Sequence, residues 1–163
     1  PKKLARPNSL PKKRTNNCKI WINESFLQEV NCSNTRYNIC WKWSYQYHQK
    51  RVDILSSDVL YEEVDLIEDK AKNESVYYLI RTVEKERIST NEKIILLADS
   101  LNAIIRDYND CLHIAFAATG KCDSLITCDY ELIRKKGKIE SFLLSQNIKL
   151  KIKTPSEFNA DFD

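Results

Sequence analysis

Glycine is scarce in this sequence, because the 163 residues contain only Gly120 and Gly137. A glycine-rich phosphate loop, of either the G-x-G-x-x-G or the Walker type, cannot be written anywhere along the chain. Long uncharged apolar runs are also absent, so we expect neither a transmembrane helix nor a secretory signal. The sequence therefore disfavours the classical mononucleotide- and dinucleotide-binding folds and indicates no membrane association.

Paired cysteine spacings are missing as well. The chain has neither a C-x-x-C pair nor the spacing of a zinc ribbon. We expect free thiols in a reducing compartment, and therefore a cytoplasmic protein. The six cysteines are Cys18, Cys32, Cys40, Cys111, Cys122 and Cys128.

Positive charge is concentrated at one end of the chain. Residues 1–14 carry six basic and no acidic side chains, which leaves 20 basic against 23 acidic residues in the remainder. With three prolines among them, residues 1–17 are expected to form a flexible basic arm, either a solvated extension or an electrostatic grip on RNA phosphates. One domain is expected over residues 18–158, with a short acidic tail over residues 159–163. The slightly acidic body argues against a broad basic nucleic-acid face.

Short strand-like runs alternate with longer helix-like runs from Cys18 onward, which favours a layered α/β domain over a helical bundle. The expected strands cover residues 18–22, 52–55, 87–89, 124–127 and 148–152. The expected helices cover residues 58–73, 75–85, 91–106 and 110–119. A capping-box signal over residues 89–92 precedes the third helix, and Gly120 is a typical residue for the end of the fourth.

Four polar residues follow strands or lie on helices where they can converge. Asn23 follows the first expected strand and Asp129 the fourth, and the carboxyl ends of parallel strands share one edge of a sheet. Glu63 lies among apolar residues at helical spacing, where an unpaired carboxylate is costly to bury. Asp110 opens a helix, so it is either an N-cap or a functional acid. His113 is expected to be a packed or hydrogen-bonded helix residue rather than a catalytic base.

Four segments together carry a family resemblance. They are DCLHIA at residues 110–115, LITCD at 125–129, KTPSEF at 153–158 and SSDVLYEEV at 56–64. Together, in their order along the chain, they resemble the motifs of the PIN-domain family, over residues 18–158. The resemblance implies a three-layer α/β/α sandwich with a mostly parallel, Rossmann-like sheet. It also implies a metal-dependent ribonuclease of the kind found as toxins in toxin-antitoxin pairs.

The resemblance further assigns roles to single residues. Glu63, Asp110 and Asp129, with Asn23 at the first motif, would hold Mg²⁺ or Mn²⁺, since hard divalent cations prefer oxygen ligands. Thr127 and Ser25 would orient the ligands or a metal-bound water. The implied partners are RNA, a protein antitoxin and a second copy in a homodimer, to which the aromatic residues 41–47 could contribute.

Asn23 departs from the family pattern, which has an aspartate at this position. An asparagine still offers a carbonyl oxygen, but its neutrality removes Coulomb attraction for a cation. Glu24 is no simple substitute, because strand alternation turns it to the opposite face. Three interpretations follow from the sequence: a ribonuclease, a catalytically reduced module that binds RNA or protein, and an interaction domain whose acids are caps and surface charges.

Overall fold

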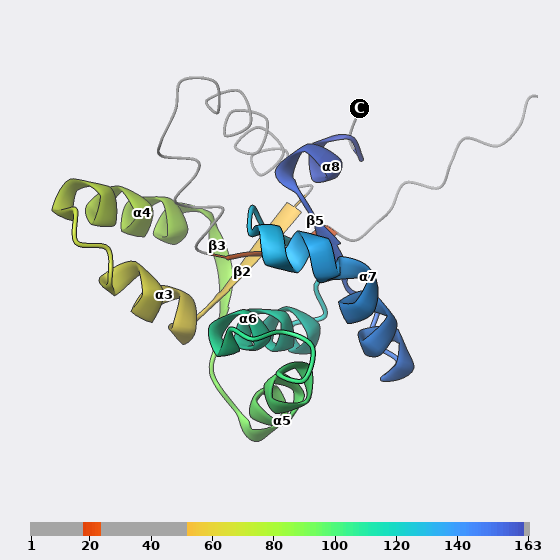
Figure 1. Cartoon of the computed structure of the whole chain (residues 1–163). Coiled ribbons are helices and arrows are strands. Elements are labelled where there is room, and N and C mark those ends of the chain that lie inside the picture. The colour runs from red at the N-terminus through yellow and green to blue at the C-terminus, as the bar shows by residue number, and fades with distance from the viewer. Residues whose placement is uncertain (1–17, 24–51, 162–163) are drawn as a thin grey trace, which may run out of the picture.

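The computed structural model describes residues 18–23 and 52–161, and these form one five-stranded sheet in which every pairing is parallel (Figure 1). The strand order is β3-β2-β1-β4-β5. β1 lies in the centre of the sheet, between β2 and β4. The strands are β1 (Cys18–Ile22), β2 (Val52–Ser57), β3 (Glu84–Ile88), β4 (Ser124–Ile126) and β5 (Lys151–Lys153).

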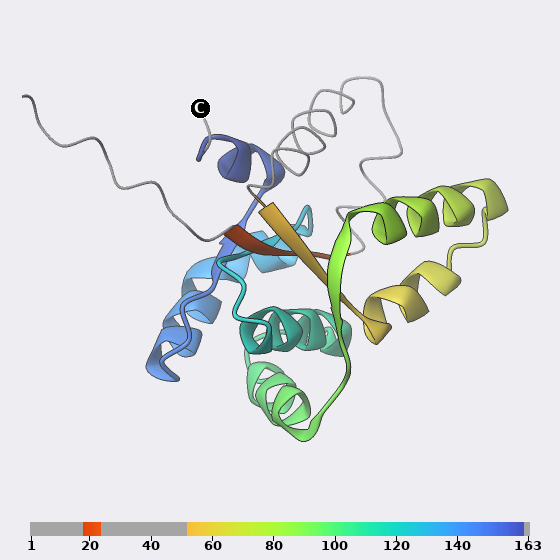
Figure 2. The same ribbon diagram turned by 180° about the vertical axis from the view of Figure 1, so that it is seen from behind.

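Helices cover both faces of the sheet. One apolar core joins the sheet to α5, α6 and α7, and a second joins it to α3, α4 and α8. Figures 1 and 2 both show α5 and α6 lying side by side. The three-layer α/β arrangement expected from the sequence is therefore confirmed. The helices are α3 (Asp58–Asp65), α4 (Lys70–Val83), α5 (Glu92–Leu101), α6 (Tyr108–Thr119), α7 (Tyr130–Ser145) and α8 (Pro155–Asn159).

Successive side chains of a strand point to opposite faces of the sheet, which explains why helices pack on both faces. In β1, Ile20 and Ile22 belong to the core beneath α3 and α4, whereas Trp21 belongs to the core beneath α6. The Trp21 ring stacks on Phe116 of α6 with 5.6 Å between ring centroids. Parallel strands buried on both faces are expected to be mostly apolar, and apart from Lys19 and Ser124 this holds for β1 and β4.

The expected helices over residues 58–73 and 75–85 were placed wrongly. α3 ends at Asp65, and a new helix, α4, starts at Lys70 because the Asp69 side chain accepts a hydrogen bond from the Lys72 backbone N–H. Strand β3 begins at Glu84, so α4 ends at Val83. An aspartate before a new turn of helix is a common N-cap, and this one divides a continuous apolar pattern.

Two helices were not expected, and α7 is the longer of them, with 16 residues. Its buried residues, Leu132, Ile139 and Leu143, are widely spaced and separated by a basic run, which weakened the apolar pattern. Gly137 lies in its exposed interior, where glycine lowers helix stability by roughly 1 kcal/mol relative to alanine. The shorter one, α8, starts with a capping box between Thr154 and Glu157.

The expected capping box over residues 89–92 is also corrected. Asn91 is the N-cap of α5, and its side chain accepts from the Ile94 N–H at 3.2 Å. Gly120 does end α6, as expected. The described cysteines, Cys18, Cys111, Cys122 and Cys128, are free thiols. Within the described ranges no helix has the length and apolar character needed to cross a membrane.

Candidate active site

The four residues singled out in the sequence lie in one cleft at the carboxyl ends of the central strands. The cleft has a volume of about 700 Å³. Among the described residues it collects six carboxylate side chains and one lysine, so acidic groups predominate in it. Its lining residues are Asn23, Glu63, Leu66, Ile67, Glu68, Asp69, Lys72, Asp107, Asn109, Asp110, His113 and Asp129.

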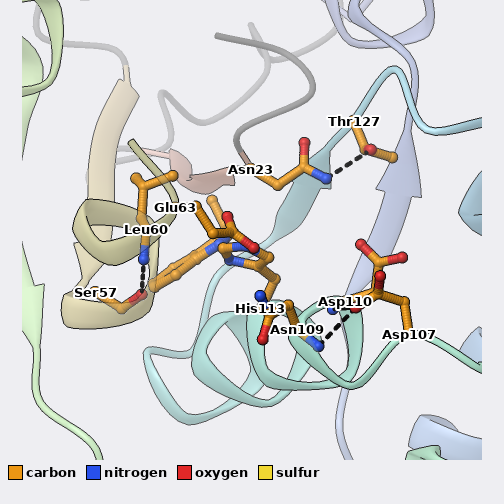
Figure 3. Close-up of polar contacts among 10 residues, drawn as sticks. Asn23, Ser57, Leu60, Glu63, Asp107, Asn109, Asp110, His113 and Thr127 are labelled. Atoms are coloured by element: carbon orange, nitrogen blue, oxygen red, sulfur yellow. Dashed lines mark hydrogen bonds and ion pairs between the residues drawn. The ribbon is translucent and has the colours of Figure 1, made fainter. Parts of the chain in front are cut away.

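Asn23 and Thr127 link the ends of two neighbouring strands (Figure 3). Asn23 follows β1 directly and is only 3% exposed. Its Nδ2 donates a hydrogen bond to Thr127 Oγ1 at 3.0 Å. The same Thr127 oxygen accepts from the backbone N–H of Asp129, also at 3.0 Å. One buried hydroxyl therefore fixes both the Asn23 amide and the backbone that carries Asp129.

Glu63 points from α3 towards His113 on α6 (Figure 3). The start of α3 is fixed by Ser57, whose hydroxyl accepts from the Leu60 N–H at 3.2 Å. Glu63 is 9% exposed, and its Oε2 lies 2.7 Å from His113 Nε2. The buried carboxylate thus has a hydrogen-bonding partner, as burial requires.

A third residue determines the tautomer of His113. The indole N–H of Trp21 donates to His113 Nδ1 at 3.3 Å. Because Nδ1 is an acceptor, the ring proton lies on Nε2 and is donated to Glu63. His113 is thus a hydrogen-bonded helix residue, as expected, and it connects β1, α6 and α3 inside the molecule.

Asp110 lies at the third position of α6 and is not its N-cap. The cap is Asp107, whose Oδ1 accepts from the backbone N–H groups of Asn109 at 2.8 Å and Asp110 at 3.4 Å (Figure 3). The Asp110 side chain is consequently left to face the cleft. Burial, together with the negative charges of Asp129 and Asp107, raises the pKa of Asp110 to about 7. The cause is a concentration of like charges in a partly desolvated place.

Asp129 has the position after a strand that the sequence predicted, and also a capping role that it did not predict. It follows β4, and it is the N-cap of α7, where its Oδ1 accepts from the Leu132 N–H at 2.8 Å. Its other carboxylate oxygen is not used in that cap. Asp129 is close enough to Asp110 for its charge to raise the pKa of that residue.

The donor set suits Mg²⁺ or Mn²⁺ in chemical type, since it consists of carboxylate and amide oxygens. The raised pKa of Asp110 points the same way, because a cation would offset both the burial and the like charges that raise it. However, within residues 18–23 and 52–161 no three histidine, cysteine or acidic side chains are already grouped as a metal site. The ligands thus share a cleft without forming a ready-made coordination sphere.

Sequence reasoning did not find every contributor to the cleft. Trp21 was treated only as a strand residue, and Asp107 was not considered, although an aspartate at a helix start is a common cap signal. Ser25, the remaining candidate, lies outside the described residues, as do the basic arm and the aromatic residues 41–47. The link between His113 and Glu63 joins positions 50 apart in sequence, so no local pattern could reveal it.

No family model matches the chain, and no curated protein matches it either. Solved structures do resemble it. One is a chain of VapBC2 from Rickettsia felis, in a structure bound to a DNA fragment from its promoter. It has 15% sequence identity and a TM-score of 0.53, and the match covers 83% of this chain and 98% of that chain. A chain of VapBC-1 from nontypeable Haemophilus influenzae has 13% identity and a TM-score of 0.59, over 85% and 98% respectively. These likenesses, with the parallel sheet and its helical layers, show that the chain has the PIN-domain fold.

Proposed function

We propose that this chain is a metal-dependent endoribonuclease of the PIN type, which cleaves phosphodiester bonds of single-stranded RNA with Mg²⁺ or Mn²⁺. The observation that carries the proposal is the convergence of Glu63, Asp110 and Asp129, from three different elements, in one cleft beside Asn23. Without a cation, such a cluster is electrostatically unfavourable, as the pKa of Asp110 indicates.

Each side chain has a separate role in this proposal. Glu63, Asp110 and Asp129 would hold the ion, with the Asn23 carbonyl oxygen as a neutral fourth donor. When bound, the ion would lower the pKa of a water molecule for in-line attack and offset charge on the leaving oxygen. Thr127 orients the backbone of Asp129 and the amide of Asn23. Ser25 is proposed to assist from the first motif.

A second candidate is a catalytically reduced PIN-type module that binds RNA or protein without cutting. The observation that favours it is the fit of the asparagine at position 23, whose amide N–H donates to Thr127. An aspartate could also be accommodated, because the Thr127 hydroxyl could donate to it while still accepting from the Asp129 N–H. Asn23 is therefore the residue on which the two candidates differ.

We also propose a protein antitoxin as a partner, because both structural neighbours come from VapBC toxin-antitoxin complexes. A homodimer and a cytoplasmic location belong to the same proposal. The basic residues 1–17 carry six positive charges and would add electrostatic attraction for RNA phosphates.

The test is degradation of a labelled single-stranded RNA with Mg²⁺, Mn²⁺ or EDTA. The unmodified chain is compared with Asn23→Asp, Asp110→Asn and a control, Asp161→Asn, which makes the same change at an exposed residue beyond α8. We expect metal-dependent cutting that Asp110→Asn abolishes and Asp161→Asn leaves intact. Asn23→Asp should increase cutting, because it restores a negative charge next to the cation.

The other outcomes separate the alternatives. Cutting by Asn23→Asp alone would identify a reduced site on an intact scaffold. Absence of cutting by every variant, with no stabilisation by divalent cations, would refute the nuclease and favour a plain interaction domain.

A further inference from the structure

Helix α7 starts at the acidic cleft and has two different exposed sides. On one side the basic residues are occupied. Lys135 Nζ donates to the Ile104 carbonyl at 2.8 Å and to Glu131 at 2.5 Å, and Lys136 pairs with Glu157 at 2.6 Å. These lysines hold α7 to neighbouring segments and are not available to a ligand.

The other side carries the α7 stripe, which we define as Tyr130, Arg134, Gly137 and Lys138. Residues 130, 134 and 138 are four apart, so they lie in a row along the helix. All four stripe residues are exposed. Within the described part of the chain, no ion pair or side-chain hydrogen bond occupies Arg134 or Lys138. The stripe thus presents two cations that make no ion pair or side-chain hydrogen bond within the described residues.

The remaining two members of the stripe are exposed to solvent within the described structure. Tyr130 directly follows Asp129 and is 77% exposed, which is unusual for a large aromatic residue. A Cβ added to Gly137 would meet nothing within 4 Å, so no neighbour in the described structure requires a glycine there. A helix with an exposed interior glycine is less stable than one with alanine. Bare backbone in an exposed stretch of helix lets a molecule outside the chain approach it closely.

We propose that the α7 stripe binds the single-stranded RNA where it leaves the cleft. Tyr130 stacks on a base, Arg134 and Lys138 contact phosphates, and the bare backbone at Gly137 lets the strand approach. This inference rests on the proposed function, because it names how that substrate is held. Charge complementarity favours nucleic acid over protein, since the acidic cleft repels phosphates and the free cations beside it offset that repulsion.

The experiment measures binding of a labelled, unpaired RNA to the full chain in EDTA. Fluorescence anisotropy at several salt concentrations reports the binding. Arg134→Glu and Lys138→Glu are compared with the control Lys85→Glu, which makes the same charge change on β3. Strand β3 is at one edge of the sheet, whereas α7 contacts β5 at the opposite edge. We expect the stripe variants to weaken binding about tenfold more than the control. Arg134→Ala and Lys138→Ala should each reduce the salt slope by about 0.7, the value for one phosphate contact on a single strand.

Two further variants test the uncharged members of the stripe. Tyr130→Ala should weaken binding about fivefold or more without changing the salt slope, whereas Tyr130→Phe should bind normally, because stacking needs only the ring. Gly137→Ala should raise the melting temperature and yet weaken RNA binding. A Gly137→Ala chain that binds RNA as tightly as the parent would contradict the close approach.

The proposal is overturned if Arg134→Glu and Lys138→Glu weaken binding no more than Lys85→Glu, or if the full chain does not bind the RNA. Because binding is measured without metal, its failure is distinguishable from failure of the nuclease. Cutting that depends on Asp110, combined with binding that ignores the stripe, would keep the proposed function and remove this inference.

Discussion

At the scale of single residues, the chain of hydrogen bonds from Trp21 through His113 to Glu63 is the most specific feature of the cleft. All three residues are buried, and each donor has one defined acceptor. A carboxylate held by a ring of fixed tautomer has little rotational freedom left. We infer that His113 is a positioning residue for Glu63 rather than a group that reacts with substrate.

His113→Leu should therefore lower the affinity for Mn²⁺, because it removes the N–H that orients Glu63. It should also reduce the free energy of unfolding by about 2 kcal/mol, since a buried carboxylate loses its partner. His113→Gln, which keeps an N–H donor, should recover much of the Mn²⁺ affinity. The measurements are Mn²⁺ titration followed by electron paramagnetic resonance, and urea unfolding. Leu143→Ala is the control, because it disturbs the same apolar core without changing a member of the hydrogen-bond chain. Equal Mn²⁺ affinity in His113→Leu and the parent would exclude the positioning role.

At the scale of elements, two different aspartates at the start of α6 have the capping role and the proposed functional role. Asp107 caps the helix, so Asp107→Ala should lower the free energy of unfolding by about 1 kcal/mol. Asp110→Asn should not lower the free energy of unfolding. Above neutral pH and without metal, this substitution should raise the free energy of unfolding, because a partly desolvated negative charge is removed. Urea unfolding of both variants measures the difference. Because asparagine can also cap a helix, a cap at position 110 is tested with Asp110→Ala, and a loss of stability similar to that in Asp107→Ala would show that Asp110 is a structural cap after all.

The sequence predicted the elements that bury a continuous or strongly periodic apolar pattern. β1 was placed at its observed bounds, and β2, β4, α5 and α6 were found with errors at their ends, because such segments carry their own signal. α7 was missed, since its three buried residues become recognisable only when the sheet that they pack against is known. The acids were found through their positions after strands. The hydrogen bonds of Glu63 with His113 and of Asn23 with Thr127 were not found, because they join residues 50 and 104 apart in the sequence.

At the scale of the whole molecule, the acidic cleft links stability to pH and to metal. The pKa of Asp110 is raised from 3.8 to about 7 on folding, so the folded chain binds more protons than the unfolded chain between these values. The contribution of Asp110 to stability is thus greatest below about pH 4 and is lost as the pH rises through about 7. In EDTA, we expect the free energy of unfolding of the parent to fall by up to a few kcal/mol relative to that of Asp110→Asn as the pH rises from about 5 to about 8. Mg²⁺ should restore more stability at about pH 8 than at about pH 6, because the ion competes with the proton for the same carboxylate. Thermal and urea unfolding across this pH range measure both effects. The electrostatic account of the cleft would be contradicted if the parent and Asp110→Asn had the same stability at every pH, with or without Mg²⁺.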